Sequence, residues 1–141
     1  MIVVDTNVLS ELSKERPDPA VSAWFLRQEP SSLTTTTVSL AEVLYGLEML
    51  PHGKRRERLS ELSRAIFETA LSGRVLAFDD AAARHYARLL AAKRRRGAPM
   101  SPLDAQIAAI AASVGASVAT RNVDDFKHCG VTIVNPWIAK S

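Results

Sequence analysis

The sequence is poor in the residues that mark several common kinds of site. It contains one cysteine, Cys129, so no disulfide can form within the chain, which is typical of a reducing compartment. Zinc sites need cysteine and histidine at short spacings, whereas the three histidines of this sequence stand far apart. We expect these histidines at the surface: His52, His85 and His128.

Long apolar runs and several catalytic motifs are also missing. No apolar run approaches the roughly 18 residues that cross a bilayer. There is no glycine-rich phosphate loop, and there is no G-x-S-x-G turn of the kind that presents a nucleophilic serine. The sequence therefore predicts a cytoplasmic protein without membrane contact, whose chemistry depends on other residue types.

The apolar residues that are present follow a regular alternation. The chain of 141 residues has no repeat or linker, and we expect a single domain over residues 1–141. Five β-type runs alternate with segments in which apolar residues recur at helical spacing. The β-type runs are 2–4, 33–36, 75–78, 117–119 and 131–134, and the helical segments are 19–28, 40–50, 58–71, 81–92 and 103–114. This alternation predicts an α/β fold with a central parallel sheet and helices on both faces.

Two connections between predicted strands, 39–72 and 80–114, each contain two predicted helices. A simple crossover between parallel strands uses one helix. One helix of each pair is therefore expected to lie across or outside the sheet, and the sequence does not identify which.

Basic residues are concentrated in two runs. The formal net charge is only +3, but residues 54–58 and 93–96 hold eight of the 18 lysines and arginines. Such runs can bind a polyanion such as RNA through its phosphates, although a solvated helix face explains each run equally well when it is taken alone. The residues considered for RNA binding are Lys54, Arg55, Arg56, Arg94, Arg95 and Arg96.

Asp5 stands directly after the uninterrupted apolar run Ile2-Val3-Val4, which is typical of a strand buried on both faces. A carboxylate in such a place is costly unless the site supplies a partner. No helix-start pattern explains its presence, so we interpret Asp5 as a ligand for a cation.

Other acidic or amide side chains are expected at the same edge of the sheet, because parallel strands end together there. Glu42 is predicted in the first turn of the helix after the second strand, and Asp104 in the first turn of the helix that leads into the fourth strand. Asn122 and Asp125 follow the fourth strand. Clustered carboxylates repel one another unless a cation holds them, and Mg²⁺ or Mn²⁺ takes oxygen ligands of this kind.

Each acid also has a structural explanation. Ser39-Leu40-Ala41-Glu42 fits a helix capping box, and Ser101-Pro102-Leu103-Asp104 fits a version with proline at the first helical position. Asp124 or Asp125 could cap the turn toward Phe126. The convergence of these acids favours a metal site over separate caps, and such a site beside basic helices suits hydrolysis of a phosphodiester by metal-activated water.

The loop after the fourth strand offers a choice between two aspartates. If the loop turns helically, Asn122 and Asp125 share a face while Asp124 points elsewhere. Phe126 is expected to anchor the loop in the core. We therefore assign Asp125 as the supplementary carboxylate and expect Asp124 to face solvent.

Five motifs, in this order and at these separations, cover nearly the whole chain. They are Asp5-Thr6-Asn7, Ser39-Leu40-Ala41-Glu42 with Gly46, Ser101-Pro102-Leu103-Asp104, Ala119-Thr120-Arg121-Asn122 and Val134-Asn135-Pro136-Trp137. Together they resemble the PIN-domain ribonucleases, and specifically the VapC-like toxins, including the FitB type, of bacterial toxin–antitoxin pairs.

The resemblance implies a PIN-like five-stranded parallel sheet and Mg²⁺- or Mn²⁺-dependent endonuclease activity on RNA. It also implies a homodimer, inhibition by a small antitoxin protein, and a larger complex with the antitoxin on operator DNA. By position, Asp5 and Asp104 are the main metal ligands, and Glu42 assists them. Thr6 or Ser39 adds a hydroxyl near the metal-bound water. Some relatives have an acid where this chain has Asn122, so the identity of the fourth ligand stays open.

Two other classes of function remain as alternatives. A receiver-like signalling domain would bind Mg²⁺ and accept a phosphoryl group, and Asp79-Asp80 after the third strand gives it some support. That class has a lysine after the last strand, where this chain has Pro136-Trp137. A non-cleaving PIN-like module that binds nucleic acid is the second alternative, and the retained acids argue against it. A haloacid-dehalogenase-like phosphatase fits less well, because its second aspartate is replaced by Asn7.

Overall fold

The computed structural model describes residues 1–139. In these residues five parallel strands form one sheet in the order β3-β2-β1-β4-β5, which confirms the predicted fold class. The strands are β1 (Ile2–Val4), β2 (Leu33–Thr36), β3 (Val75–Leu76), β4 (Ser117–Ala119) and β5 (Ile133–Val134). The single domain predicted over 1–141 includes residues 140 and 141, which lie outside the described residues.

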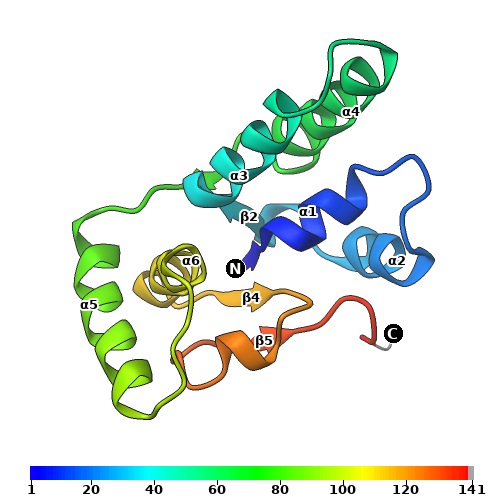
Figure 1. The fold of residues 1–141 in the computed structure, drawn as a ribbon. Helices are drawn as coiled ribbons and strands as arrows, with labels where there is room; N and C mark the ends of the chain where they lie inside the picture. The colour runs from blue at the N-terminus through cyan, green and yellow to red at the C-terminus, as the bar shows by residue number, and fades with distance from the viewer. Residues whose placement is uncertain (140–141) are drawn as a thin grey trace.

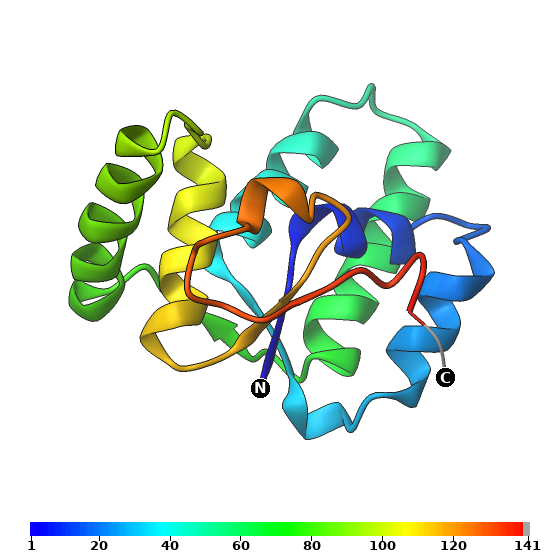
Figure 2. The same ribbon diagram turned by 90° about the horizontal axis from the view of Figure 1, so that it is seen from below.

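Helices cover both faces of the sheet (Figures 1 and 2). They are α1 (Thr6–Leu12), α2 (Pro19–Arg27), α3 (Thr37–Glu48), α4 (Lys54–Arg64), α5 (Asp80–Arg95) and α6 (Pro102–Ser113), with the short helices η1 (Pro30–Ser32), η2 (Ala65–Ala70) and η3 (Asp124–Phe126). Successive strand residues point to opposite faces. Val3 accordingly packs in the cluster with α6, and Val4 packs in the cluster with α1 and α2.

In the two connections that contain two helices each, the helices are arranged differently relative to the sheet. In the second connection α6 lies against the sheet, and α5 packs on the outside of α6 (Figure 1). In the first connection α3 and α4 form an antiparallel pair, and η2 then carries Ile66 and Phe67 back to the core with α1 and α2. Here η2 is a π-helical continuation of α4.

Several predicted boundaries were wrong. Helix α1 was missed, β3 and β5 have two residues each where four were predicted, and the helix predicted over 58–71 begins at Lys54 and changes to π geometry at Ala65. The error at α1 has a physical cause. A seven-residue helix has too little periodicity to recognise, and it is stabilised by packing of Val8 and Leu9, which are fully buried.

All five strands point the same way, so their carboxyl ends meet at one edge of the sheet. In Figure 2 β1 runs upward from the N-terminus, and this edge lies toward the top. The first turns of α1, α3 and α6 lie there together with η3. Among residues 1–139 no helix is long and apolar enough to cross a membrane.

Candidate active site

Asp5 lies at the carboxyl edge, and both oxygens of its carboxylate accept hydrogen bonds from neutral donors. Its Oδ1 accepts a hydrogen bond from the Thr6 backbone N–H at 2.8 Å. Its Oδ2 accepts from the Thr120 hydroxyl at 2.7 Å and from the Asn7 side-chain amide at 3.2 Å. Asp5 is also the N-cap of α1, so the interpretation that no helix start explains this residue was wrong.

Burial dominates the acid–base behaviour of Asp5, which is 3% exposed. Its pKa is raised from 3.8 to about 6, mainly by burial and to a smaller extent by the charges of Asp104 and Glu42, while the hydrogen bonds from Thr120 and Thr6 act in the opposite direction. The negative charges of these acids therefore act on one another at this edge, as the sequence predicted. A cation placed among them would relieve both the burial cost and the repulsion.

A chain of hydroxyl groups orients Glu42. The Thr6 hydroxyl donates to Glu42 Oε1 at 2.7 Å, and its oxygen lies 3.0 Å from Ser39 Oγ. Thr36 Oγ1 lies 3.3 Å from the same Ser39 oxygen. Because the single Thr6 proton goes to the carboxylate, the Ser39 hydroxyl is left to donate to Thr6. Ser39 and Thr36 are fully buried, so this end of the hydrogen-bond chain is shielded from water, whereas Thr6 and Glu42 are partly exposed.

The capping-box explanation for Glu42 was wrong. Helix α3 begins at Thr37, and its N-cap is Thr36, whose hydroxyl accepts a hydrogen bond from the Ser39 backbone N–H at 3.0 Å. Glu42 therefore lies in the second turn of α3 rather than the first, and it makes no cap. Glu42 instead accepts a hydrogen bond from Thr6, and its charge acts on Asp5.

At Asp104 the predicted helix cap is present in the structure. Ser101 is the N-cap of α6, its hydroxyl accepts from the Asp104 backbone N–H at 3.1 Å, and Pro102 is the first helical residue. The Asp104 carboxylate is partly buried. Burial raises its pKa, a hydrogen bond with Ser101 lowers it by less, and the charges of Asp125 and Glu42 raise it further.

The two aspartates of the loop after β4 are both exposed but have different neighbours. Asp125 acts electrostatically on Asp104, whereas Asp124 is exposed and pairs with Lys127 at 2.7 Å. Phe126 is fully buried and anchors the loop. Asn122 is exposed; its backbone N–H donates to Thr120 Oγ1 at 3.0 Å, and this contact holds the start of the loop beside Asp5.

Sequence reasoning missed two residues that hold Asp5. Thr120 is fully buried, and Asn7 joins it to Asp5 through its side-chain amide, which lies 3.2 Å from both Thr120 Oγ1 and Asp5 Oδ2. The register of the sheet, rather than a sequence motif, brings Thr120 to Asp5. Val4 of β1 pairs with Ala119 of β4, so the residues that follow them, Asp5 and Thr120, must lie side by side.

The donor set fits a hydrated divalent ion. Within residues 1–139 no three histidine, cysteine, aspartate or glutamate side chains are grouped closely enough to hold a metal ion by themselves. Mg²⁺ keeps several waters and is commonly bound through only one or two carboxylates. The mutual influence of Asp5, Glu42 and Asp104 fits that looser arrangement.

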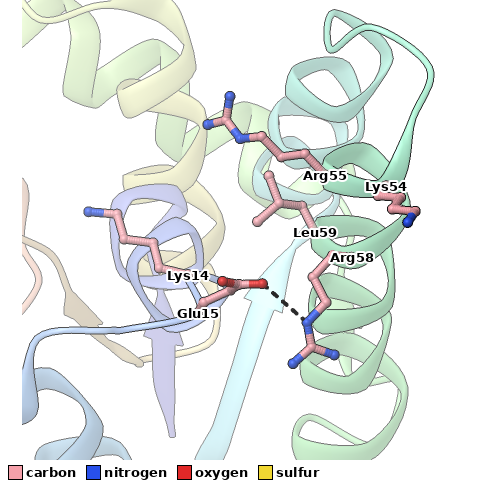
Figure 3. Close-up of a pocket in the computed structure, with 6 residues that line it drawn as sticks. All are labelled: Lys14, Glu15, Lys54, Arg55, Arg58 and Leu59. Carbon is pink, nitrogen blue, oxygen red and sulfur yellow. Dashed lines mark ion pairs between the residues drawn. The ribbon is translucent and has the colours of Figure 1, made fainter.

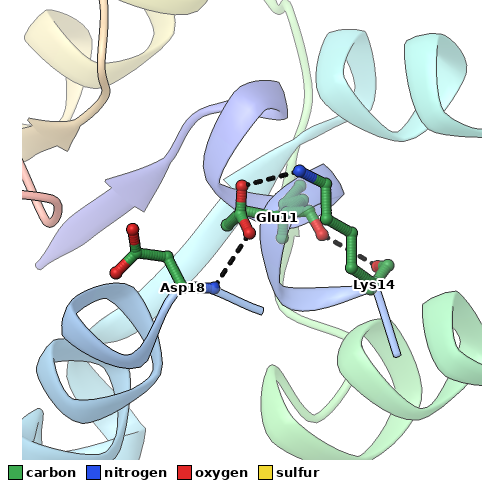
Figure 4. Close-up of polar contacts among 5 residues, drawn as sticks. Glu11, Lys14 and Asp18 are labelled. Carbon is green, nitrogen blue, oxygen red and sulfur yellow. Dashed lines mark hydrogen bonds and ion pairs between the residues drawn. The ribbon is translucent and has the colours of Figure 1, made fainter. Parts of the chain in front are cut away.

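A basic pocket of about 610 Å³ lies between the end of α1 and the first half of α4 (Figure 3). Its lining residues are Lys14, Glu15, Lys54, Arg55, Arg58 and Leu59. Arg58 pairs with Glu15 at 3.4 Å. Lys14 pairs with Glu11 at 3.0 Å (Figure 4), which leaves Lys54 and Arg55 as the cations of this pocket without an ion pair among the described residues.

The two basic runs differ in how many of their charges are free. Arg56 donates to the Leu50 carbonyl and pairs with Glu48 at 3.2 Å, so its charge is used within the protein. In the second run Lys93 is buried and donates to the Lys127 carbonyl at 3.0 Å. The three arginines at the end of this run are exposed: Arg94, Arg95 and Arg96.

A parallel sheet with carboxylates gathered at its carboxyl edge defines the class as α/β proteins with an acidic edge site. Comparison with known families is more specific, because the PIN domain model matches residues 2–131. The chain belongs to the PIN-domain family.

Named relatives match over nearly their full length. The chain is 43% identical to VapC ribonuclease Y4jK of Sinorhizobium fredii over 97% of this chain and 98% of that protein. It is 31% identical to Toxin FitB of Neisseria gonorrhoeae over 97% of this chain and 99% of that protein. The solved structure of FitAB bound to an IR36 DNA fragment superposes with a TM-score of 0.91 at 30% identity, covering 100% of this chain and 99% of the solved chain.

Proposed function

We propose that this chain is an endoribonuclease that acts as the toxin of a toxin–antitoxin pair and hydrolyses RNA phosphodiester bonds. The observation that carries the proposal is the buried Asp5 carboxylate beside Glu42 and Asp104, in a chain 43% identical to a protein named as a VapC ribonuclease. The 31% identity to a protein named Toxin FitB supports the toxin assignment.

PIN-domain nucleases use divalent metal ions, and in this chain we assign Mg²⁺, with Mn²⁺ as a substitute, to Asp5 and Asp104. When bound, the ion supplies an activated water and neutralises charge on the phosphate. Glu42 Oε1 accepts from the Thr6 hydroxyl, so Oε2 would be free to orient an attacking water or to accept its proton. Ser39 fixes Thr6 in this arrangement, and Asp125 or the Asn122 amide completes the ligand set.

The same proposal covers the partners. RNA phosphates contact Lys54, Arg55 and the three arginines at 94–96, while a small antitoxin protein inhibits the homodimer and joins it on operator DNA. The likeness to FitAB bound to DNA, at 30% identity, supports such an assembly. We take residues 1–141 as one domain.

The receiver-like alternative loses its main support in the structure. Asp79, one of the two acids that favoured it, is the N-cap of α5, and its Oδ1 accepts from the Ala82 backbone N–H at 2.9 Å. A capping role accounts for this carboxylate without a phosphoryl group. The non-cleaving module is left as the outcome that an activity assay would reveal.

Cleavage of labelled RNA by the purified chain tests the proposal. With Mg²⁺ we expect cleavage that stops on chelation and falls at least about 100-fold in Asp5→Asn and Asp104→Asn, since each removes a charged ligand. Asp80→Asn is the matched control, because Asp80 is an exposed acid of α5 paired with Arg84 at 3.1 Å. Circular dichroism checks that each variant is folded. Cleavage that survives chelation, or both substitutions, would overturn the metal assignment.

A further inference from the structure

Arg121 lies next to the acidic edge, but its side chain makes no ion pair or hydrogen bond with the acids described there. It directly follows Thr120, and its backbone N–H donates to Asn7 Oδ1 at 3.2 Å, so its main chain is fixed two hydrogen bonds from the Asp5 carboxylate. Its side chain turns toward the C-terminal segment. There the central guanidinium carbon stands 4.9 Å from the centre of the Trp137 ring.

Trp137 is itself held in place. Its backbone N–H donates to Asn135 Oδ1 at 3.0 Å, and its ring packs against the core cluster that contains Val4 and Val8. A guanidinium placed over the face of an indole ring keeps its positive charge and its N–H donors, because the ring is neutral and offers no anion. The stack thus orients Arg121 without neutralising it.

The Arg121 guanidinium takes part in no ion pair and no side-chain hydrogen bond with any other described residue of the chain. The charge of Arg121 acts on Glu11. Burial raises the pKa of Glu11, but the hydrogen bonds from Lys14 and Asp18 and the charges of Lys14 and Arg121 outweigh it, so the pKa is lowered overall. Glu11 already accepts from Lys14 at 3.0 Å and from the Asp18 backbone N–H at 2.9 Å (Figure 4). Arg121 therefore offers an oriented cation with free donors.

We propose that Arg121 binds an RNA phosphate adjacent to the scissile phosphate, and that the Trp137 ring holds the Arg121 guanidinium in the binding orientation. This inference rests on the proposed function. The carboxylates of Asp5, Glu42 and Asp104 repel an incoming RNA backbone, so a fixed cation next to them favours binding of the strand. Arginine suits this task, because its planar fork binds phosphate oxygens in pairs.

A phosphate contact predicts a loss of substrate binding rather than of chemistry. In Arg121→Gln we expect KM to rise about tenfold with kcat little changed, as befits one charge-assisted contact. The salt dependence of RNA binding, measured in the Asp104→Asn background to prevent cleavage, should become shallower by about 0.7 in its logarithmic slope. Arg121→Lys keeps the charge without the fork, and should recover part of the loss.

Two further variants separate the role of the stack from general stability. Trp137→Leu should weaken RNA binding less than Arg121→Gln, and the double variant should bind no more weakly than Arg121→Gln alone, because Trp137 acts through the arginine. Arg27→Gln is the matched control. Arg27 is exposed at the end of α2, on the opposite edge of the sheet, and its loss should leave KM and the slope unchanged. Thermal unfolding checks each variant.

The failures are distinguishable. A wild-type chain that cleaves no RNA would overturn the proposed function and this inference with it. If the wild type cleaves, then an Arg121→Gln variant with unchanged KM and slope, or one that loses kcat alone, overturns the phosphate contact. Additive losses in the double variant would overturn the role of Trp137. If Arg121→Gln weakens binding to the antitoxin protein but not to RNA, the guanidinium serves a protein contact and the proposal is wrong.

Discussion

At the scale of single residues, Asp5 combines two tasks that the sequence did not connect. It begins α1 as its N-cap, and it presents a buried carboxylate to the acidic edge. Three neutral donors stabilise that carboxylate without cancelling its charge. The protein's own hydrogen bonds therefore hold the Asp5 carboxylate in place, but in an electrostatically costly form.

The choice between Asp124 and Asp125 can be tested at the same scale. Because Asp125 acts on Asp104 while Asp124 pairs with Lys127, we expect Asp125→Asn to lower metal affinity and cleavage about tenfold. Asp124→Asn, its natural control, should behave as the wild type. Calorimetric titration of Mg²⁺ and initial cleavage rates measure both effects. Equal, near-wild-type behaviour of both variants would leave a site of three carboxylates, and a larger loss at Asp124 would reverse the assignment.

At the scale of elements, α4 and α5 carry basic runs of similar composition but different availability. Arg56 of the first run pairs with Glu48, and Lys93 of the second run donates to the Lys127 carbonyl, so neither charge is available to a ligand. The charges that remain are exposed at the beginning of α4 and the end of α5, both on the side of the carboxyl edge in Figure 2. Composition alone overstates how many cations can reach a polyanion.

Replacing the exposed cations tests this distinction. Substitution of Arg94, Arg95 and Arg96 by glutamine should weaken RNA binding and reduce its salt slope by up to about 2, at about 0.7 for each phosphate that is no longer neutralised. The pair Lys54→Gln and Arg55→Gln should act in the same direction. Arg56→Gln should instead lower thermal stability with little change in slope, because it removes the pair with Glu48. Unchanged slopes in the first two variants would mean that these runs are solvated helix faces.

At the scale of the whole molecule, the acidic edge makes stability depend on pH. A pKa raised by folding means that the folded chain binds the proton more tightly than the unfolded chain. The contribution of Asp5 is thus favourable below pH 3.8 and is lost as the pH rises to about 6. Burial raises the pKa of Asp104 too, which adds a change of the same sign.

Metal-free Asp5→Asn should therefore be more stable than the wild type at pH 7, by about 1 to 2 kcal/mol. The full rise of the Asp5 pKa corresponds to about 3 kcal/mol, and the new amide offsets part of it by facing the Asn7 donor. Below pH 4 the gain should vanish. Thermal unfolding between pH 4 and 7.5 in chelator measures it, and parallel curves for the two proteins would show that Asp5 carries no such strain.

The sequence by itself determined the alternation of strands and helices, the parallel sheet, and the arrival of Asp5, Asp104 and Asp125 at one edge. These follow from local rules, since β-branched runs, helical spacing and the Ser101-Pro102 start each act within a few residues. Resemblance of the motifs to PIN domains added the family, which the comparisons confirm.

Tertiary structure alone decided how the acids are held. The Thr120 hydroxyl reaches Asp5 across 115 positions, and the Thr6 hydroxyl reaches Glu42 across 36. Helix α1 forms because Val8 and Leu9 pack into the core, and the start of α3 at Thr37 moves Glu42 out of the capping position. Local propensity cannot encode such contacts, because their stability comes from burial and hydrogen bonding between segments that meet only after the chain has folded.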